Sequence, residues 1–153
     1  MCISIGRHHI RYAILPHTGP LDHRTVRAGY NFNSPHRLAH HPKPESVARL
    51  FGSFHIAGAL NLVIDTIKRG DDDEDVSVDH LPKRKGKNII VRIFDSLGGK
   101  STGKLHWGDI PVKKVYETNL LEDDGKELPI SEDGGHVVIT ARAFEILTLR
   151  LQL

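Results

Sequence analysis

NIIVRIFDS, residues 88–96, is the stretch that decides the fold. Its alternate positions form two sets, Ile89, Val91 and Ile93 on one side and Ile90, Arg92 and Phe94 on the other. A run of β-branched residues with a period of two is typical of a β-strand. Successive side chains of a strand point to opposite faces, so one face of this segment can fill a protein core.

The same pattern recurs on both sides of this stretch. NLVIDTIKR (61–69) alternates in the same way, and the leucines at the C-terminal end keep a strict period of two. Further short runs of this kind are RLFGSFHIAG (49–58), GKLHWGDI (103–110), VKKVYETNLLED (112–123), HVVITAR (136–142) and EILTLRLQL (145–153). Short strands with turn signals about every ten residues predict an all-β fold, an antiparallel β-sandwich. We expect residues 61–68 and 88–95 to be its central strands.

The N-terminal part has a different sequence pattern. Residues 3–15 alternate in part up to Pro16 and predict one strand, and residues 21–32 predict a short helix with Asp22 as its cap. Residues 34–46 contain three prolines and are interpreted as a linker. We therefore expect two parts, a strand, helix and linker over 1–44 and a β-sandwich over 45–153.

The composition limits the possible function classes. The 153 residues suit one domain, or one domain plus a fragment, and a net charge of +2 does not favour nucleic acid as a partner. No apolar run approaches the roughly 20 residues of a membrane span, so no membrane association is expected. The start, MCISIGRHH, lacks the apolar stretch of a secretory signal. Cys2 is the single cysteine, which excludes an internal disulfide and favours a reducing compartment.

FDSLGGKSTGK, residues 94–104, has part of a phosphate-binding loop. Gly99, Lys100 and Ser101 follow an apolar strand, as the end of that motif requires. The leading glycine of the motif would fall at Phe94, however, and no helical period follows to present its N-terminus to a phosphate. We interpret the stretch as a hairpin turn in which Gly98 and Gly99 adopt positive φ.

DDDEDVSVDHLP, residues 71–82, resembles a calcium-binding loop only in its first half. Three aspartates stand at positions one, three and five, but the loop then has Val76 where glycine is needed and Pro82 where glutamate is needed. The favoured interpretation is a solvated, mobile acidic loop over 70–87. Its charge is offset in part by Lys83, Arg84 and Lys85.

The eleven histidines do not predict a metal site. They include two groups, His8 with His9 and His36 with His40 and His41. Adjacent histidines on a strand point to opposite faces, and the prolines at 42 and 44 argue against a helix that would bring His36 and His40 together. His17 is expected to make a structural hydrogen bond. The acidic residues lie mostly in loops, so no catalytic, cofactor-binding or metal residue is predicted.

Several stretches together resemble the C-terminal end of the family 38 glycoside hydrolases, most of all the large cytosolic or vacuolar α-mannosidases of fungi and animals. The resemblance covers Gly6 to Leu153 in order, with Asp71 where glutamate is usual, and the 70–87 loop is similar to the fungal form. The stretches that carry it are GRHHIRYAILPHTG (6–19), TVRAGYNFNSP (25–35), NLVIDTIKRGDDDEDVS (61–77), IIVRIFDSLGGKSTGKL (89–105), IPVKKVYETNLLED (110–123) and AFEILTLRLQL (143–153).

The resemblance implies how the chain relates to a larger enzyme. It implies that the first strand and helix end a β-supersandwich and that the remainder is a small C-terminal β-sandwich. The nucleophilic aspartate and the zinc ligands of the family lie in an N-terminal barrel, so none of them is carried over to a residue here. Met1 is expected to mark a truncated gene model, a pseudogene or a deliberate fragment. Lys68, Arg69, Arg92 and Asp95 match recurrent charged positions and are interpreted as ion pairs of the sandwich.

The function that the resemblance implies is structural. The chain is expected to help hold together an α-mannosidase that hydrolyses terminal α-D-mannosyl residues of oligosaccharides, and to be inactive alone. The implied partners are the rest of the parent chain and further copies in a homo-oligomer, in the cytoplasm or vacuole. Two alternatives stay open. One is a carbohydrate-binding module that uses Trp107, Tyr116 and Tyr30, and the other is a protein-interaction module that uses the 70–87 loop.

Overall fold

The computed structural model describes residues 6–34, 54–78 and 83–153. The chain divides into two units, Met1–Leu38 and Ala39–Leu153. Cys2, His36, His40, His41, most of the predicted linker and the start of the strand predicted over 49–58 lie outside the described residues.

The first unit contains one helix, α1 (His23–Asn33). The Asp22 carboxylate accepts a hydrogen bond of 2.9 Å from the backbone N–H of Arg24, and a second one comes from Thr25. These bonds satisfy donors that the first turn of a helix leaves open, so Asp22 is the N-cap, as predicted. The helices of the described part of the chain include none with the length and apolar character needed to cross a bilayer.

The strand predicted over residues 3–15 does not form in residues 6–15, the part of it that the structure describes. Residues 7–17 have no regular secondary structure, and Ile10, Tyr12 and Ile14 are almost fully exposed, Tyr12 at 87%. A strand obtains its backbone hydrogen bonds from a neighbouring strand. No strand within residues 6–34, 54–78 and 83–153 pairs with this segment. Alternation therefore predicted an element whose partner is missing from the described residues.

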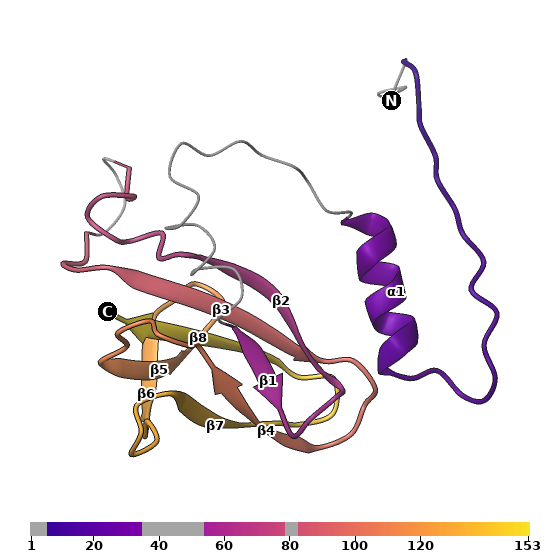
Figure 1. Ribbon diagram of the computed structural model, residues 1–153. Coiled ribbons are helices and arrows are strands. Elements are labelled where there is room, and N and C mark those ends of the chain that lie inside the picture. Colours follow the sequence, from indigo (N-terminus) through magenta and orange to yellow (C-terminus); the bar gives the residue numbers. More distant parts are fainter. Residues whose placement is uncertain (1–5, 35–53, 79–82) are drawn as a thin grey trace. The chain divides into compact units, whose positions relative to one another are not determined.

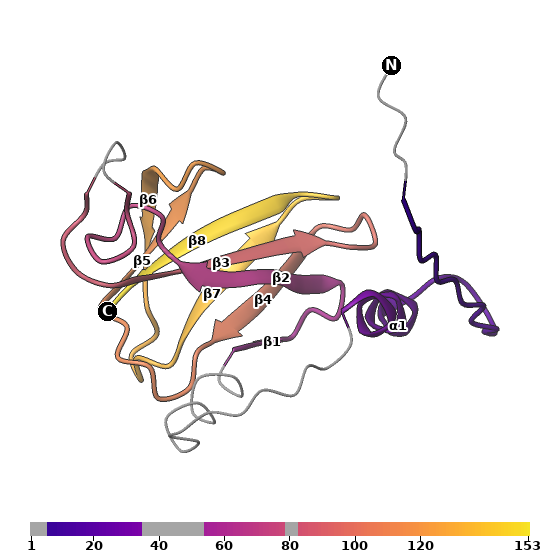
Figure 2. The same cartoon turned by 90° about the horizontal axis from the view of Figure 1, so that it is seen from above.

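The second unit is an antiparallel β-sandwich, which confirms the predicted fold class (Figures 1 and 2). The smaller sheet has the order β1-β4-β7 and the larger has the order β2-β3-β8-β5-β6. The strands of the smaller sheet are β1 (His55–Ala57), β4 (Ser101–His106) and β7 (His136–Ala141). Those of the larger sheet are β2 (Leu62–Arg69), β3 (Asn88–Asp95), β8 (Ile146–Gln152), β5 (Lys114–Thr118) and β6 (Asp124–Leu128).

The core lies between the two sheets and uses the alternation seen in the sequence. Val91 and Ile93 of β3 and Leu149 of β8 are buried there, and the smaller sheet contributes Leu105 and Val137. The other buried core residues are Ala59, Leu62, Ile89, Trp107, Val115, Ile139, Ala141, Leu147 and Leu151. Each sheet therefore turns one apolar face inward, as sandwich packing requires.

One prediction about strand arrangement was wrong, and one strand was missed. Residues 61–68 are not central, because β2 lies at the edge of the larger sheet and β3 pairs with β8 on its other side. β6 was missed because its sequence, DGKEL, is almost entirely exposed and has no apolar alternation. The apolar pattern does not specify strand order, and it gives no signal for a strand whose residues are exposed.

The stretch 94–104 is not a hairpin turn. β3 belongs to the larger sheet and β4 to the smaller, so residues 96–100 carry the chain from one layer to the other. Gly98 has the predicted positive φ, 81°, but Gly99 is not among the positive-φ glycines of the described chain. A Cβ at Gly98 would stand 2.4 Å from the Phe144 ring, so this turn also needs glycine for space.

Val91 is fully buried in β3, and its truncation tests the core. We expect Val91→Ala to lower the free energy of unfolding by about 1 to 3 kcal/mol, through lost burial and the cavity left behind. The measurement is urea unfolding. Val138→Ala in β7 is the matched control, because Val138 is 53% exposed and should cost less than about 0.5 kcal/mol. Equal costs for the two variants would contradict the sandwich.

Candidate functional site

The acidic loop that follows β2 is partly buried, which corrects the prediction of a solvated loop. Asp73 is fully buried. Its carboxylate accepts hydrogen bonds from the backbone N–H of Asn88 (2.9 Å) and from Asn88 Nδ2 (2.5 Å), and it pairs with Arg69 Nη2 at 2.7 Å. These donors replace the water that a buried carboxylate loses, so burial is tolerated.

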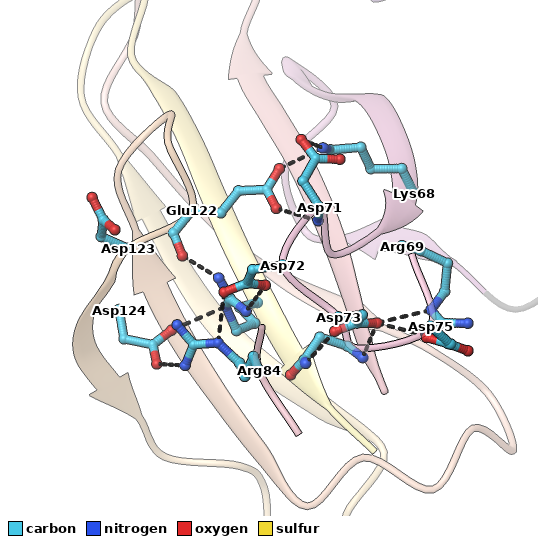
Figure 3. Close-up of polar contacts among 12 residues, drawn as sticks. Lys68, Arg69, Asp71, Asp72, Asp73, Asp75, Arg84, Glu122, Asp123 and Asp124 are labelled. Atoms are coloured by element: carbon cyan, nitrogen blue, oxygen red, sulfur yellow. Dashed lines mark hydrogen bonds and ion pairs between the residues drawn. The ribbon is translucent and has the colours of Figure 1, made fainter. Parts of the chain in front are cut away.

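Arg150 stands at the centre of this region. It lies on β8 and is 1% exposed. Its guanidinium pairs with Asp72 Oδ1 at 2.9 Å and with Asp124 Oδ1 at 3.0 Å, and it donates to the carbonyl oxygen of Glu122. Arg84 then contacts the same two aspartates, with Nε 2.8 Å from Asp72. Two arginines and two aspartates thus alternate in a closed ring (Figure 3).

Glu122 connects a second turn to the loop after β2. It is 4% exposed, and its Oε1 lies 2.5 Å from Lys68 Nζ while Oε2 accepts from the backbone N–H of Asp71 at 3.1 Å. The turn between β5 and β6 is therefore fastened to the loop after β2 (Figure 3). We call these residues together the charge network: Lys68, Arg69, Asp71, Asp72, Asp73, Arg84, Glu122, Asp124 and Arg150.

The hydrogen bonds and ion pairs of the charge network favour the charged forms of its side chains. Burial alone would raise the pKa of Asp72, but hydrogen bonds from Arg150 and Arg84 outweigh it and leave the pKa lowered. Burial disfavours the Lys68 ammonium, yet its bonds to Asp71 and Glu122 raise its pKa above the ordinary value. A glycosidase acid instead needs a raised carboxyl pKa. The network is therefore suited to holding loops and not to proton transfer.

Among the described residues Asp95 is held without a cation, which corrects its interpretation as an ion-pair residue. Its buried carboxylate accepts from the backbone N–H groups of Gly98 (2.7 Å) and Phe144 (2.8 Å) and from Asn61 Nδ2 (2.5 Å). Burial acts to raise its pKa, but the bonds from Phe144 and Asn61 outweigh it and lower the pKa. Ion pairs do form at the other three positions, with Arg92 3.5 Å from Glu122.

A row of three histidines crosses the smaller sheet. His55, His106 and His136 occupy partner positions on β1, β4 and β7, with ring centroids 4.6 Å and 4.9 Å apart. Burial, reinforced by the neighbouring rings, lowers the pKa of His106 below its ordinary value, against the opposing influence of Asp133. Sequence reasoning missed this row because only the strand register brings the three residues together.

The described residues do not offer a metal centre. The His55 and His106 rings are stacked face to face, 2° from parallel. In the acidic loop, Asp71 contacts Lys68, while Asp73 and Asp75 both contact Arg69. Within the described ranges no group of three His, Cys, Asp or Glu side chains is placed to hold an ion.

The aromatic residues proposed for sugar stacking do not form a platform. Trp107 is fully buried in the core, and its indole N–H donates to the Gly134 carbonyl at 3.1 Å. Tyr116 is half-buried on β5, with Lys114 Nζ 6.0 Å from its ring centroid. Tyr30 belongs to α1 in the first unit. The carbohydrate-binding alternative thus loses its largest aromatic residue.

Comparisons with known proteins give the class of this sandwich. Residues 61–149 match the family described as "Glycosyl hydrolases family 38 C-terminal beta sandwich domain", and the chain belongs to this family. The family predicted from the sequence is therefore confirmed.

Particular relatives are α-mannosidases. The alpha-mannosidase of Saccharomyces cerevisiae is 33% identical over 156 residues, which cover 97% of this chain and 14% of the relative. Alpha-mannosidase 2C1 of Homo sapiens is 25% identical over 149 residues, which cover 97% of this chain and 13% of the relative. Alpha-mannosidase 2C1 of Mus musculus is 24% identical over 151 residues, which cover 98% of this chain and 13% of the relative. The chain spans about a seventh of the length of the curated relatives it matches.

Removal of the Arg150 guanidinium tests the charge network. We expect Arg150→Met to cost about 3 to 5 kcal/mol of stability, because Asp72 and Asp124 lose their buried partner. The measurement is urea unfolding. Arg142→Met is the matched control, since Arg142 is 83% exposed in its pair with Glu145 and its loss should have little effect on stability. A similar loss of stability in the two variants would show that the charge network does not stabilise the fold.

The histidine row predicts a pH dependence. Because the pKa of His106 is lowered in the folded chain, the unfolded chain binds that proton more tightly. Stability is therefore expected to fall as the pH drops below about 6.5, the ordinary value for histidine. His106→Gln should flatten the dependence of the unfolding free energy on pH between pH 7 and pH 5, measured by urea unfolding at each pH. If the pH dependence of stability is the same in the His106→Gln variant, its assignment to His106 is wrong.

Proposed function

We propose that this chain serves as the C-terminal β-sandwich of an α-mannosidase and stabilises the rest of that enzyme without taking part in catalysis. The observation that carries the proposal is the family match over residues 61–149. The relatives support it, because they align with almost the whole chain while most of their own length lies outside the aligned region.

The chemistry of the described side chains supports a structural role. Asp72 and Asp95 have lowered pKa values and are held by hydrogen-bond donors, so they are poor proton donors near neutral pH. Arg150 and Glu122 are committed to joining loops. We assign no catalytic, cofactor-binding or metal-ligating residue to this chain, and we place the zinc ion of the family in the rest of the enzyme.

The activity that we propose for the whole enzyme is the one that the family resemblance implies, and the relatives, which are named α-mannosidases, support it. It is the hydrolysis of terminal α-D-mannosyl residues of oligosaccharides. The partner of this chain is the rest of that polypeptide, and we propose a homo-oligomer in the cytoplasm or vacuole. A stand-alone sugar-binding module is less well supported, because Trp107 is in the core. A contact role for the 70–87 loop is also less well supported, because Asp72, Asp73 and Arg84 are already bound within the sandwich.

The test is a hybrid enzyme in which this chain replaces the aligned segment of the S. cerevisiae α-mannosidase. We expect the hybrid enzyme to be soluble and to hydrolyse an aryl α-mannoside, because the sandwich restores the contacts that the enzyme needs. The yeast enzyme with the segment deleted should be aggregated or should lose activity on mild heating. The measurements are turnover and its half-life at raised temperature.

The isolated chain provides the control for the absence of catalysis. With the same substrate and added zinc or cobalt it should show no turnover above a boiled sample. Activity of the isolated chain would overturn the structural assignment. Full activity and thermal stability of the deletion variant would overturn the proposed supporting role.

A further inference from the structure

The smaller sheet of the sandwich has a weakly attached edge. β1 is three residues long and lies at the end of the order β1-β4-β7, where β4 is its neighbour (Figure 1). β4 and β7 are each six residues long and pair over their whole length. Cross-strand pairs are the unit of stabilisation in a sheet, so a strand with three of them is held much less firmly than one with six. β1 can therefore separate from β4 while the rest of the sheet stays intact.

One apolar contact and one ring stack keep β1 in place. Ile56 is packed against the core and lies opposite Leu105 of β4. Gly103 allows this close approach, because a Cβ there would stand 2.9 Å from Ile56 Cγ2. On the other face of the strands, the His55 ring stacks on the His106 ring with the centroids 4.6 Å apart. While the two rings are neutral, such an aromatic cross-strand pair adds to the attachment of β1.

Protonation changes the ring stack from an attraction to a repulsion. His55 and His106 are direct partners on neighbouring strands, and their rings are 2° from parallel. Two like charges in such positions destabilise a sheet. The positive groups around His106 are His55 on β1, His136 on β7 and Lys104 on β4 itself. Each of them disfavours a charge on the His106 ring.

A carboxylate offsets the charge at one end of the histidine row. Asp133 Oδ1 lies 3.5 Å from His136 Nδ1, and Asp133 also favours the charged form of His106. No carboxylate pairs with His55 in the part of the chain that the structure describes. The repulsion across β1 and β4 is therefore the part of the row that stays uncompensated. Burial, followed by the neighbouring His55 and His136 rings, lowers the pKa of His106, which agrees with a cost for charging it in place.

We propose that the histidine row is a pH-sensitive switch that releases β1 from β4 as the pH falls. His55 is the member of the row that β1 carries, so movement of β1 separates this charge from the other two. His106 and His136 stay together, because β4 and β7 remain paired. Release leaves β4 as the edge of the smaller sheet and takes Ile56 away from Leu105. The backbone groups of β4 then become available for hydrogen bonds with another strand.

Hydrogen exchange of the whole chain, measured by mass spectrometry at pH 7 and pH 5, tests the release of β1. The rates are corrected for the intrinsic effect of pH on exchange. Peptides that contain residues 55–57 should lose about tenfold in protection at pH 5, the factor that corresponds to one pKa unit of repulsion. Peptides from β3, residues 88–95, should lose much less, because they exchange only when the sandwich opens further.

Two substitutions identify the charges that release β1. His55→Gln puts a neutral side chain on β1 at both pH values, so it should abolish the loss of protection at pH 5. His55 is exposed, and the variant is therefore expected to fold. His136→Gln is the matched control, because it changes the end of the row where Asp133 offsets the charge. This variant should keep most of the loss.

Each other outcome would overturn the switch. Equal losses in the β1 and β3 peptides would show that the whole sandwich unfolds instead of releasing one strand. Equal protection of β1 at both pH values would show that the ring stack tolerates its charges. A full loss in the His55→Gln variant, or its abolition by His136→Gln, would assign the effect to groups other than the β1–β4 pair. The proposed function is tested separately by the hybrid enzyme, whose activity these measurements do not use.

Discussion

The sandwich depends on a buried guanidinium in the middle of its larger sheet. Arg150 lies on β8, between the core leucines 149 and 151, with its side chain on the opposite face. A charge taken out of water there is costly unless it is paired and hydrogen-bonded. Asp72, Asp124 and the Glu122 carbonyl meet that requirement, and they come from two loops that are distant in sequence. The position of both loops therefore follows from one residue.

This constraint divides the outer face of the larger sheet into two chemically different halves. The half around Arg150 carries cations on the strands and anions on the loops, so the chain covers it with its own turns. The half around Ile146 has apolar partner positions on the strands, and the neighbouring Arg142 and Glu145 pair with each other. Buried ion pairs specify one arrangement of loops more than they add net stability. The charge network thus holds the loops at one end of the sheet by specific contacts.

Much of the fold could be predicted because strand periodicity is local. Val91 and Leu149 are in the core as their alternation indicated, and Asp22 caps α1. Strand order could not be predicted, since the same apolar alternation suits an edge strand such as β2 and a central strand such as β3. The strand predicted over residues 3–15 failed for a related reason: alternation does not show whether a partner is present.

The candidate site was harder to predict because its parts meet only in three dimensions. The pattern of EILTLRLQL places Arg150 away from the core, where an arginine normally reaches water. Its burial depends on aspartates 78 and 26 positions earlier in the chain. Asp73 looked solvated for the same reason, since DDDEDVS contains no signal of the Asn88 and Arg69 donors that hold it. Charged residues that appear to be surface residues in the sequence therefore determine how the loops of this sandwich are held.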